Sequence, residues 1–214
     1  MGVPSEGMVE PQQDRSQEST RRLLDAAAEL VAEGGVGRAT LAAIGARAGY
    51  SRGLVSARFG SKQNLLWALV QRSTDEWFSE LRAPASAGSG LERLTALIGL
   101  IAANSEREPQ ALRVLERLIF EATGDPVLRE RFVASQRLME RDVASLVRRG
   151  IGDGSIHAGV DPQVEAALLV AALRGIAYQW FLYPEEVDLS GLHRALAARL
   201  AERIGVQSPS DGHA

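Results

Sequence analysis

Apolar residues recur at spacings of three and four along most of the chain, and this period limits the fold more than any other feature of the sequence. The last such run repeats Leu192, Leu196, Leu200 and Ile204. No segment shows the apolar–polar alternation of a half-buried strand, and glycine or proline interrupts the pattern at intervals. We therefore expect an all-α fold of about nine helices.

Two short helices are predicted close together near the N-terminal end. Thr40 is a good N-cap for a helix over 41–48, and Gly49 supplies a left-handed C-terminal turn. Ser51 caps a second helix over 52–58. Two short capped helices separated by a three-residue turn form a helix-turn-helix pattern, with an earlier helix from about Ser19 to pack against it.

The helix-turn-helix lies in a basic stretch of an acidic protein. Residues 34–74 hold six arginine or lysine residues and no Asp or Glu, which leaves the rest of the chain at −9 against −3 for the whole. Neutralising DNA phosphates requires such a surface, because each contact releases condensed counterions. An ordinary solvated face is the alternative interpretation of the same charges.

Residues 40–62 resemble the signature of TetR-family repressors. The matching positions are Thr40, Ile44, Ala48, Gly49, Ser51, Gly53, Phe59, Ser61 and Lys62. Three positions differ: Gly45 replaces the usual Ala, Ser56 the usual phosphate-contacting Tyr, and Arg58 the usual His or Tyr. The resemblance covers about residues 19–70 and implies sequence-specific binding of double-stranded DNA.

A recognition helix places its N-terminal residues at base edges in the major groove, so Arg52 is the candidate for reading a base. Gly53 would let the DNA backbone approach closely, and Thr40 at a helix N-terminus can bind a phosphate. Lys62, the only lysine, is implied by the resemblance to contact phosphate. The full set of DNA-binding candidates is Thr40, Ser51, Arg52, Gly53, Leu54, Ser56, Arg58 and Lys62.

The C-terminal region is expected to pair two copies of the chain. A predicted helix over 164–182 is apolar almost all round from Ala166 to Leu173, and its second apolar face would lack partners within its own chain. The family resemblance implies a four-helix dimer interface made with the last helix, and hence a near-palindromic operator. The interface candidates are Val164, Leu168, Ala171, Gly175, Leu196 and Leu200.

In the family that the sequence resembles, the helices predicted between Ser61 and Leu182 surround an apolar effector cavity. A small, apolar or amphipathic effector of unknown identity would bind there and release the repressor from DNA. The candidate lining residues are Trp77, Phe78, Leu97, Ile101, Phe120, Met139, Tyr178 and Trp180. Ordinary core packing is the competing interpretation of each of them.

These expectations divide the chain into four parts: a flexible N-terminal arm at 1–15, a DNA-binding domain at 16–62, an effector-binding and dimerisation domain at 63–206, and a disordered tail at 207–214. No window has the roughly 18 uncharged apolar residues of a spanning helix, which predicts a cytoplasmic protein without membrane contact.

An enzyme built on a helical bundle and a protein-binding scaffold with a degenerate helix-turn-helix are the alternatives to a repressor. The enzyme gains little support, because the chain has no cysteine and its three histidines lack metal-binding spacing. His157, His193 and His213 are interpreted as surface or capping residues. No metal or cofactor is expected.

Overall fold

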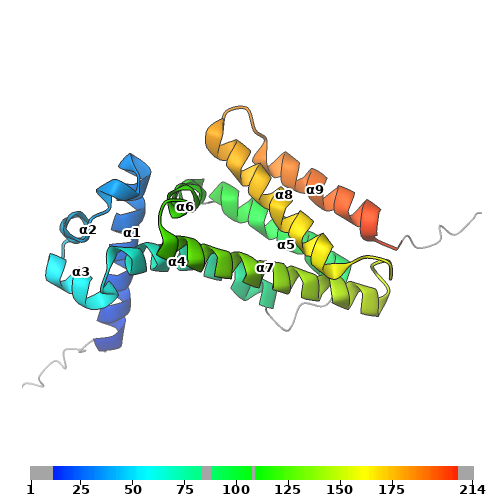
Figure 1. Cartoon of the computed structure of the whole chain (residues 1–214), viewed down its shortest axis with the longest axis horizontal. Coiled ribbons are helices and arrows are strands. Elements are labelled where there is room, and N and C mark those ends of the chain that lie inside the picture. The colour runs from blue at the N-terminus through cyan, green and yellow to red at the C-terminus, as the bar shows by residue number, and fades with distance from the viewer. Residues whose placement is uncertain (1–11, 83–87, 108, 207–214) are drawn as a thin grey trace, which may run out of the picture. The chain divides into compact units, whose positions relative to one another are not determined.

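The computed structural model describes the backbone of residues 12–82, 88–107 and 109–206; the side chains of 12–14, 73–82, 110 and 111 are not among the described atoms. Across these ranges the chain forms nine α-helices, one short 3-10 helix and no strand beyond an isolated bridge between Ile156 and Gly205, which confirms the all-α prediction (Figure 1). The helices are α1 (Gln12–Gly34), α2 (Leu41–Ala48), α3 (Arg52–Phe59), α4 (Lys62–Arg82), α5 (Gly90–Arg107), α6 (Pro109–Ala122), α7 (Pro126–Asp153), α8 (Pro162–Leu182) and α9 (Leu189–Ile204), with the 3-10 helix η1 (Val36–Arg38) after α1.

The first helix begins earlier than the apolar period indicated. α1 starts at Gln12, so residues 12–15, expected in the arm, are helical. Its N-terminal turns are stabilised by charge instead of burial: Glu18 binds Arg21 and Arg22 at 2.8 Å each. Such i,i+3 and i,i+4 pairs support a helix without leaving an apolar signal in the sequence. Residues 1–11 and 207–214 lie outside the described residues.

Residues up to Leu69 form one compact unit, seven residues longer than the domain boundary expected after Lys62. Helices α2 and α3 pack on each other, and α2 also packs against α1. The buried side chains include Leu23 and Val31 of α1, Ile44 of α2 and Val55 of α3, each without measurable exposure. The start of α4 completes this core.

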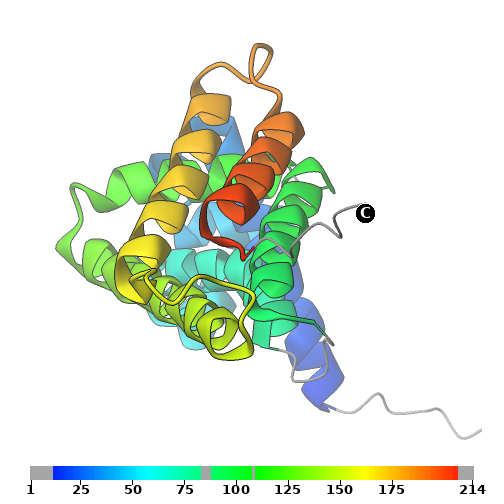
Figure 2. The ribbon, with the colours of Figure 1, turned by 90° about the vertical axis from the view of Figure 1, so that its right-hand side faces the viewer.

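Residues from Val70 onward form the second unit, whose main body is the bundle of α5 to α9 (Figure 2). α8 and α9 lie side by side, α5 packs on α9, and α7 packs on both α5 and α8. α5 and α7 meet at two glycines: a Cβ on Gly90 would lie 2.2 Å from the backbone nitrogen of Gly150. The backbone N–H of Gly90 also donates to Asp153 at 2.8 Å, which fixes the start of α5.

Candidate nucleic-acid interface and effector site

The helix-turn-helix is built by the caps that the sequence predicts. The N–H of Ala43 donates to Thr40 Oγ1 at 3.1 Å, and the N–H of Leu54 donates to Ser51 Oγ at 3.2 Å. Gly49 ends α2 with φ +80°, a conformation that favours glycine. Both short helices therefore have defined starts, which fixes the direction in which α3 presents its first turn.

Gly45 explains how tightly α2 meets the turn. A Cβ at this position would lie 2.8 Å from the carbonyl oxygen of Tyr50 and 3.2 Å from a methyl group of Val55. The N–H of Tyr50 donates to the Gly45 carbonyl at 2.7 Å. Glycine in place of the alanine usual in the family thus allows this close approach of the turn to α2.

The arginines of the basic stretch have different surroundings. Arg47 is held by Glu29 at 3.0 Å and Glu33 at 2.9 Å, both on α1. Arg58, one of the DNA-binding candidates, donates to the Ser16 carbonyl and to the Ser16 and Thr20 hydroxyls. Both arginines therefore tie the helix-turn-helix to α1.

Arg52 and Lys62 differ from those two arginines. Arg52 is the first residue of α3 and is exposed, and Lys62 is the first residue of α4 and is half-buried. Neither side chain has a hydrogen bond or ion pair with another part of the chain that the structure describes. Their charges are available to an outside partner.

Gly53 is a glycine that the fold does not require. It is exposed, its φ is not positive, and a Cβ there would approach only Ser51 Oγ, at 3.7 Å. A glycine inside a helix is less favourable than alanine by about 0.5–1 kcal/mol, so its presence needs a reason outside the folded chain. Ser56, the residue that replaces the family tyrosine, is also exposed, whereas Leu54 is half-buried.

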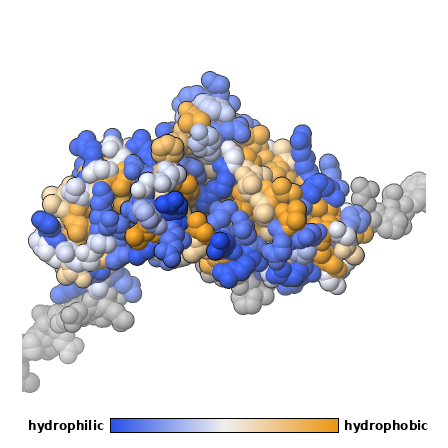
Figure 3. All heavy atoms as spheres, viewed as in Figure 1, coloured by the Kyte–Doolittle hydropathy of each residue, from blue (hydrophilic) through white to orange (hydrophobic). Residues whose placement is uncertain are grey.

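One face of α8 is apolar and exposed. Val164, Leu168 and Tyr178 are 55%, 54% and 51% exposed. Ala171 is exposed and Gly175 half-buried on the same face, which appears as an apolar patch over α8 (Figure 3). α8 is also the one described helix with the length and composition of a membrane span, and its two apolar faces account for that composition.

The interface candidates on α9 are less accessible. Leu196 is half-buried, and Leu200, 3% exposed, lies in the core of its own chain. The expectation that Leu200 faces a partner is therefore wrong: the residue packs inward among α5, α7 and α8 side chains.

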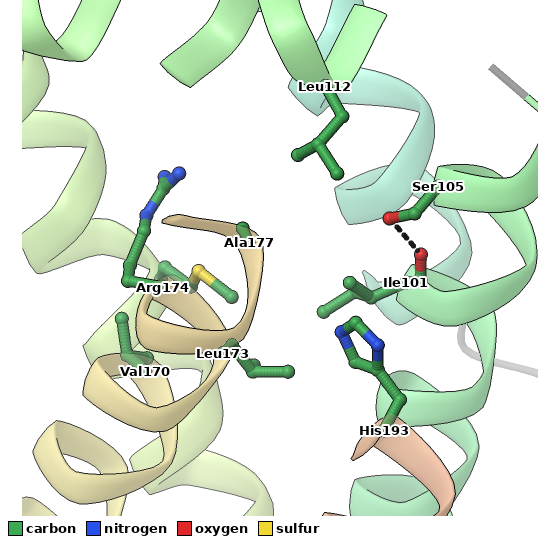
Figure 4. Close-up of a pocket in the computed structure, with 9 residues that line it drawn as sticks. Ile101, Ser105, Leu112, Val170, Leu173, Arg174, Ala177 and His193 are labelled. Carbon is green, nitrogen blue, oxygen red and sulfur yellow. Dashed lines mark hydrogen bonds between the residues drawn. The ribbon is translucent and has the colours of Figure 1, made fainter. Parts of the chain in front are cut away.

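An inner cavity lies within the C-terminal bundle, bounded by α5, α6, α7, α8 and α9 (Figure 4). Ile101 and Met139 from the predicted set are on its wall. The residues that the sequence interpretation missed are Ser105, Leu112, Val170, Leu173, Arg174, Ala177 and His193. Its volume of about 30 Å³ suits one or two water molecules and not a larger effector.

The other effector candidates lie elsewhere. Phe120 is 72% exposed, so it does not line a cavity. Leu97 packs in the main core and Trp180 in a smaller cluster with Leu112, because aromatic and aliphatic residues on these helices fill the bundle itself. The side chains of Trp77 and Phe78 are outside the described residues.

His193 projects into the inner cavity from α9, and its interpretation as a surface or capping residue is wrong (Figure 4). It is 2% exposed, and its Nδ1 lies 2.7 Å from the Leu189 carbonyl, to which it donates. Burial lowers the pKa of His193, so the ring is neutral and Nε2 is left as an acceptor.

A wider cleft of about 540 Å³ opens beside the inner cavity, and Arg174 lines both. Tyr178, the one predicted effector residue not yet placed, lies on the wall of this cleft. Glu116 of α6 and Arg174 of α8 both line it, and their side chains lie 3.5 Å apart. Burial raises the pKa of the Glu116 carboxyl, and Arg174 opposes that change only in part. The described residues include no cluster that could hold a metal ion.

A capped helix-turn-helix with outward basic residues, followed by a separate helical bundle, is the architecture of a DNA-binding transcriptional regulator. Residues 23–69 match the family described as bacterial regulatory proteins of the tetR family, and residues 90–205 match the BetI-type transcriptional repressor C-terminal domain. The chain belongs to the TetR family of transcriptional regulators.

Individual relatives agree with this assignment. BetI of Escherichia coli is 30% identical over 162 residues, covering 72% of this chain and 83% of BetI. SrpR of Pseudomonas putida is 25% identical over 166 residues, covering 77% of this chain and 76% of SrpR. Both relatives are transcriptional regulators.

Solved structures share the whole fold. The complex of SmeT with triclosan is 26% identical, with a TM-score of 0.81 over 90% of this chain and 94% of SmeT. SmeT represses the SmeDEF multidrug efflux pump of Stenotrophomonas maltophilia. The family matches show that the chain is a DNA-binding transcriptional repressor.

Proposed function

We propose that α3 reads the operator in the major groove, with Arg52 at a base edge and Lys62 and Thr40 on phosphates. The main support is that Arg52 and Lys62 have no hydrogen-bond or ion-pair partner among the described residues. Arg47 and Arg58, in contrast, are bound to α1. An arginine at the start of a recognition helix can donate two hydrogen bonds to guanine. Gly53, Ser51 and Ser56 share the exposed surface of this helix and its turn.

The test compares Arg52→Ala with Lys62→Ala in binding to DNA duplexes. The duplexes are taken from the region upstream of the protein's own coding sequence, and each carries a single base change. We expect Arg52→Ala to relax base preference at one position by about 1–3 kcal/mol, and Lys62→Ala to weaken binding evenly and reduce the salt dependence. Arg148→Ala, on an exposed arginine of α7, is the charge-matched control. Identical base profiles for Arg52→Ala and Lys62→Ala would refute the assigned roles.

We also infer that two copies pair through the exposed face of α8. Val164, Leu168, Ala171, Gly175 and Tyr178 recur at spacings of three and four, the period of a helix–helix seam. A two-fold dimer would set the recognition helices about 34–36 Å apart and require a near-palindromic operator.

The dimer proposal is tested with two matched charge insertions. Leu168 on the α8 face and Val127 on α7 are 54% and 51% exposed. Analytical ultracentrifugation should show that Leu168→Glu shifts the protein to monomer and that Val127→Glu does not. A stable wild-type monomer at micromolar concentration would contradict the proposal.

We infer that the effector enters the C-terminal bundle through the cleft lined by Arg174 and Glu116, and that binding favours a conformation that fits the operator less well. The SmeT–triclosan complex supports a small-molecule site in this fold. A coupling of about 1–3 kcal/mol, roughly 5- to 150-fold in operator affinity, is sufficient for such a switch.

A repressor that binds chromosomal DNA acts in the bacterial cytoplasm.

A further inference from the structure

The pair formed by Glu116 and Arg174 is poorly satisfied for its position. The Nη1 of Arg174 and the Oε1 of Glu116 are 3.5 Å apart, whereas charge-assisted hydrogen bonds are usually about 2.7–2.9 Å. The Glu116 side chain is 7% exposed and that of Arg174 32%. Within the described chain each is the other's only polar partner, so most donor and acceptor positions of both groups are unused.

The surroundings of this pair suit an apolar body. Leu115, Ile119, Phe132, Val133 and Tyr178 line the same cleft. Its volume of about 540 Å³ lies within the usual range for small-molecule sites. The cleft thus has an apolar part next to the ionic pair, and polar side chains of α7 complete its lining.

Two other charged residues line the cleft, Arg137 and Glu140, both on α7. Glu140 accepts a hydrogen bond from Gln136 at 3.2 Å. With Glu116 and Arg174 included, the lining holds two acidic and two basic side chains. The summed charge therefore attracts neither a cation nor an anion, and the class of ligand depends on the pair itself.

A charged head group would break the pair. A cation on Glu116 displaces Arg174, and an anion on Arg174 displaces Glu116, so in each case a charge stays in the cleft without its partner. Leaving one member of such a pair unpaired is strongly unfavourable. A neutral hydroxyl or primary amide has both a donor and an acceptor, so it can satisfy both partners at once. Arg174 is exposed enough to move aside for it.

We propose that the effector is a neutral amphipath whose hydroxyl, phenol or amide head inserts between Glu116 and Arg174, donating to the carboxylate and accepting from the guanidinium. Its apolar body lies on Leu115, Ile119 and Phe132. This inference rests on the proposed effector function and names the chemical class for that site.

The test uses three probes with one chain length and different heads: 1-octanol, octanoate and octyltrimethylammonium. Isothermal titration calorimetry of the full-length protein at pH 7.5 should show 1-octanol binding at least about tenfold tighter than either ion, or ~1.4 kcal/mol. Failure of 1-octanol to bind, or tighter binding of either ion, would overturn the proposal.

Two variants should change the order of affinities in opposite directions. Glu116→Gln leaves Arg174 without a carboxylate, so the affinity for octanoate should rise relative to that for 1-octanol. Arg174→Gln leaves Glu116 without a guanidinium, so the affinity for octyltrimethylammonium should rise instead. Glu121→Gln removes a carboxylate from the exposed surface of α6, outside the cleft lining, and should leave the order unchanged. Equal effects of all three variants would refute the role of the pair, and circular dichroism melts verify that each is folded.

Operator binding is measured separately, by fluorescence anisotropy of a labelled upstream DNA fragment. Absence of salt-dependent DNA binding would reject the proposed function, while calorimetry would still decide the head-group class. If an ionic compound releases the DNA and 1-octanol does not, the neutral head-group class is rejected while the proposed repressor function stands.

Discussion

Substitution of Gly53 separates the demands of folding from those of DNA binding. A Cβ at this position meets no atom closer than Ser51 Oγ at 3.7 Å, and the backbone is not left-handed. Gly53→Ala should therefore stabilise the fold by about 0.5–1 kcal/mol, the usual gain for alanine in a helix. For a protein of this length, about 1 kcal/mol corresponds to roughly 2–4 °C in melting temperature.

The same methyl group should weaken operator binding, because it occupies the space through which the DNA backbone would approach α3. We expect a loss of about tenfold, ~1.4 kcal/mol. The measurements are a thermal melt and fluorescence anisotropy on operator DNA. Gly99→Ala in α5, where a Cβ meets nothing within 4 Å, is the matched control and should stabilise without changing DNA affinity. Unchanged affinity in Gly53→Ala would refute the proposed close approach at this residue.

Three further outcomes follow from particular contacts. Gly90→Ala should destabilise the bundle by about 1–3 kcal/mol in urea unfolding, because its Cβ would meet the backbone of α7; stabilisation like that expected for Gly99→Ala would contradict this packing. The depressed pKa of His193 means that the unfolded chain binds a proton near pH 6.5 while the native ring does not, so stability should fall as pH drops below about 6.5. His193→Gln should flatten that slope, whereas His157→Gln, at an exposed residue, should not. Ser51→Ala removes the cap of α3 and should cost about 0.5–2 kcal/mol, checked by thermal melting; an unchanged melt would mean that the cap adds nothing.

The helix-turn-helix could be predicted closely because local interactions determine it. Thr40, Gly49 and Ser51 act within three residues of their own positions, so sequence spacing alone indicates their roles. The contacts that the arginine side chains make could not be predicted in this way. Arg58 contacts Ser16, 42 residues away, and only the folded arrangement of α1 and α3 brings them together.

The effector region was predicted less well, because large apolar residues on these helices can fill the core as well as line a ligand site. Trp180 and Leu97 instead fill the cores of the bundle, where large apolar groups gain most from burial. A more specific signal was present in the helical period. His193 lies on the buried face of α9 with Leu189, Leu200 and Ile204, at spacings of four, seven and four residues.

The same signal applies to the ionic pair of the cleft. Arg174 lies four residues after Val170 and three before Ala177, both buried on α8. Glu116 lies four residues after buried Leu112 on α6. A charged residue on an apolar helix face must either find a partner or neutralise its charge, because burying an isolated charge is costly. When two such residues face each other with a long contact, as here, the fold has satisfied them only in part. The unused hydrogen-bonding capacity is then available to a ligand, and it is this capacity, more than the apolar lining, that can distinguish one amphipath from another.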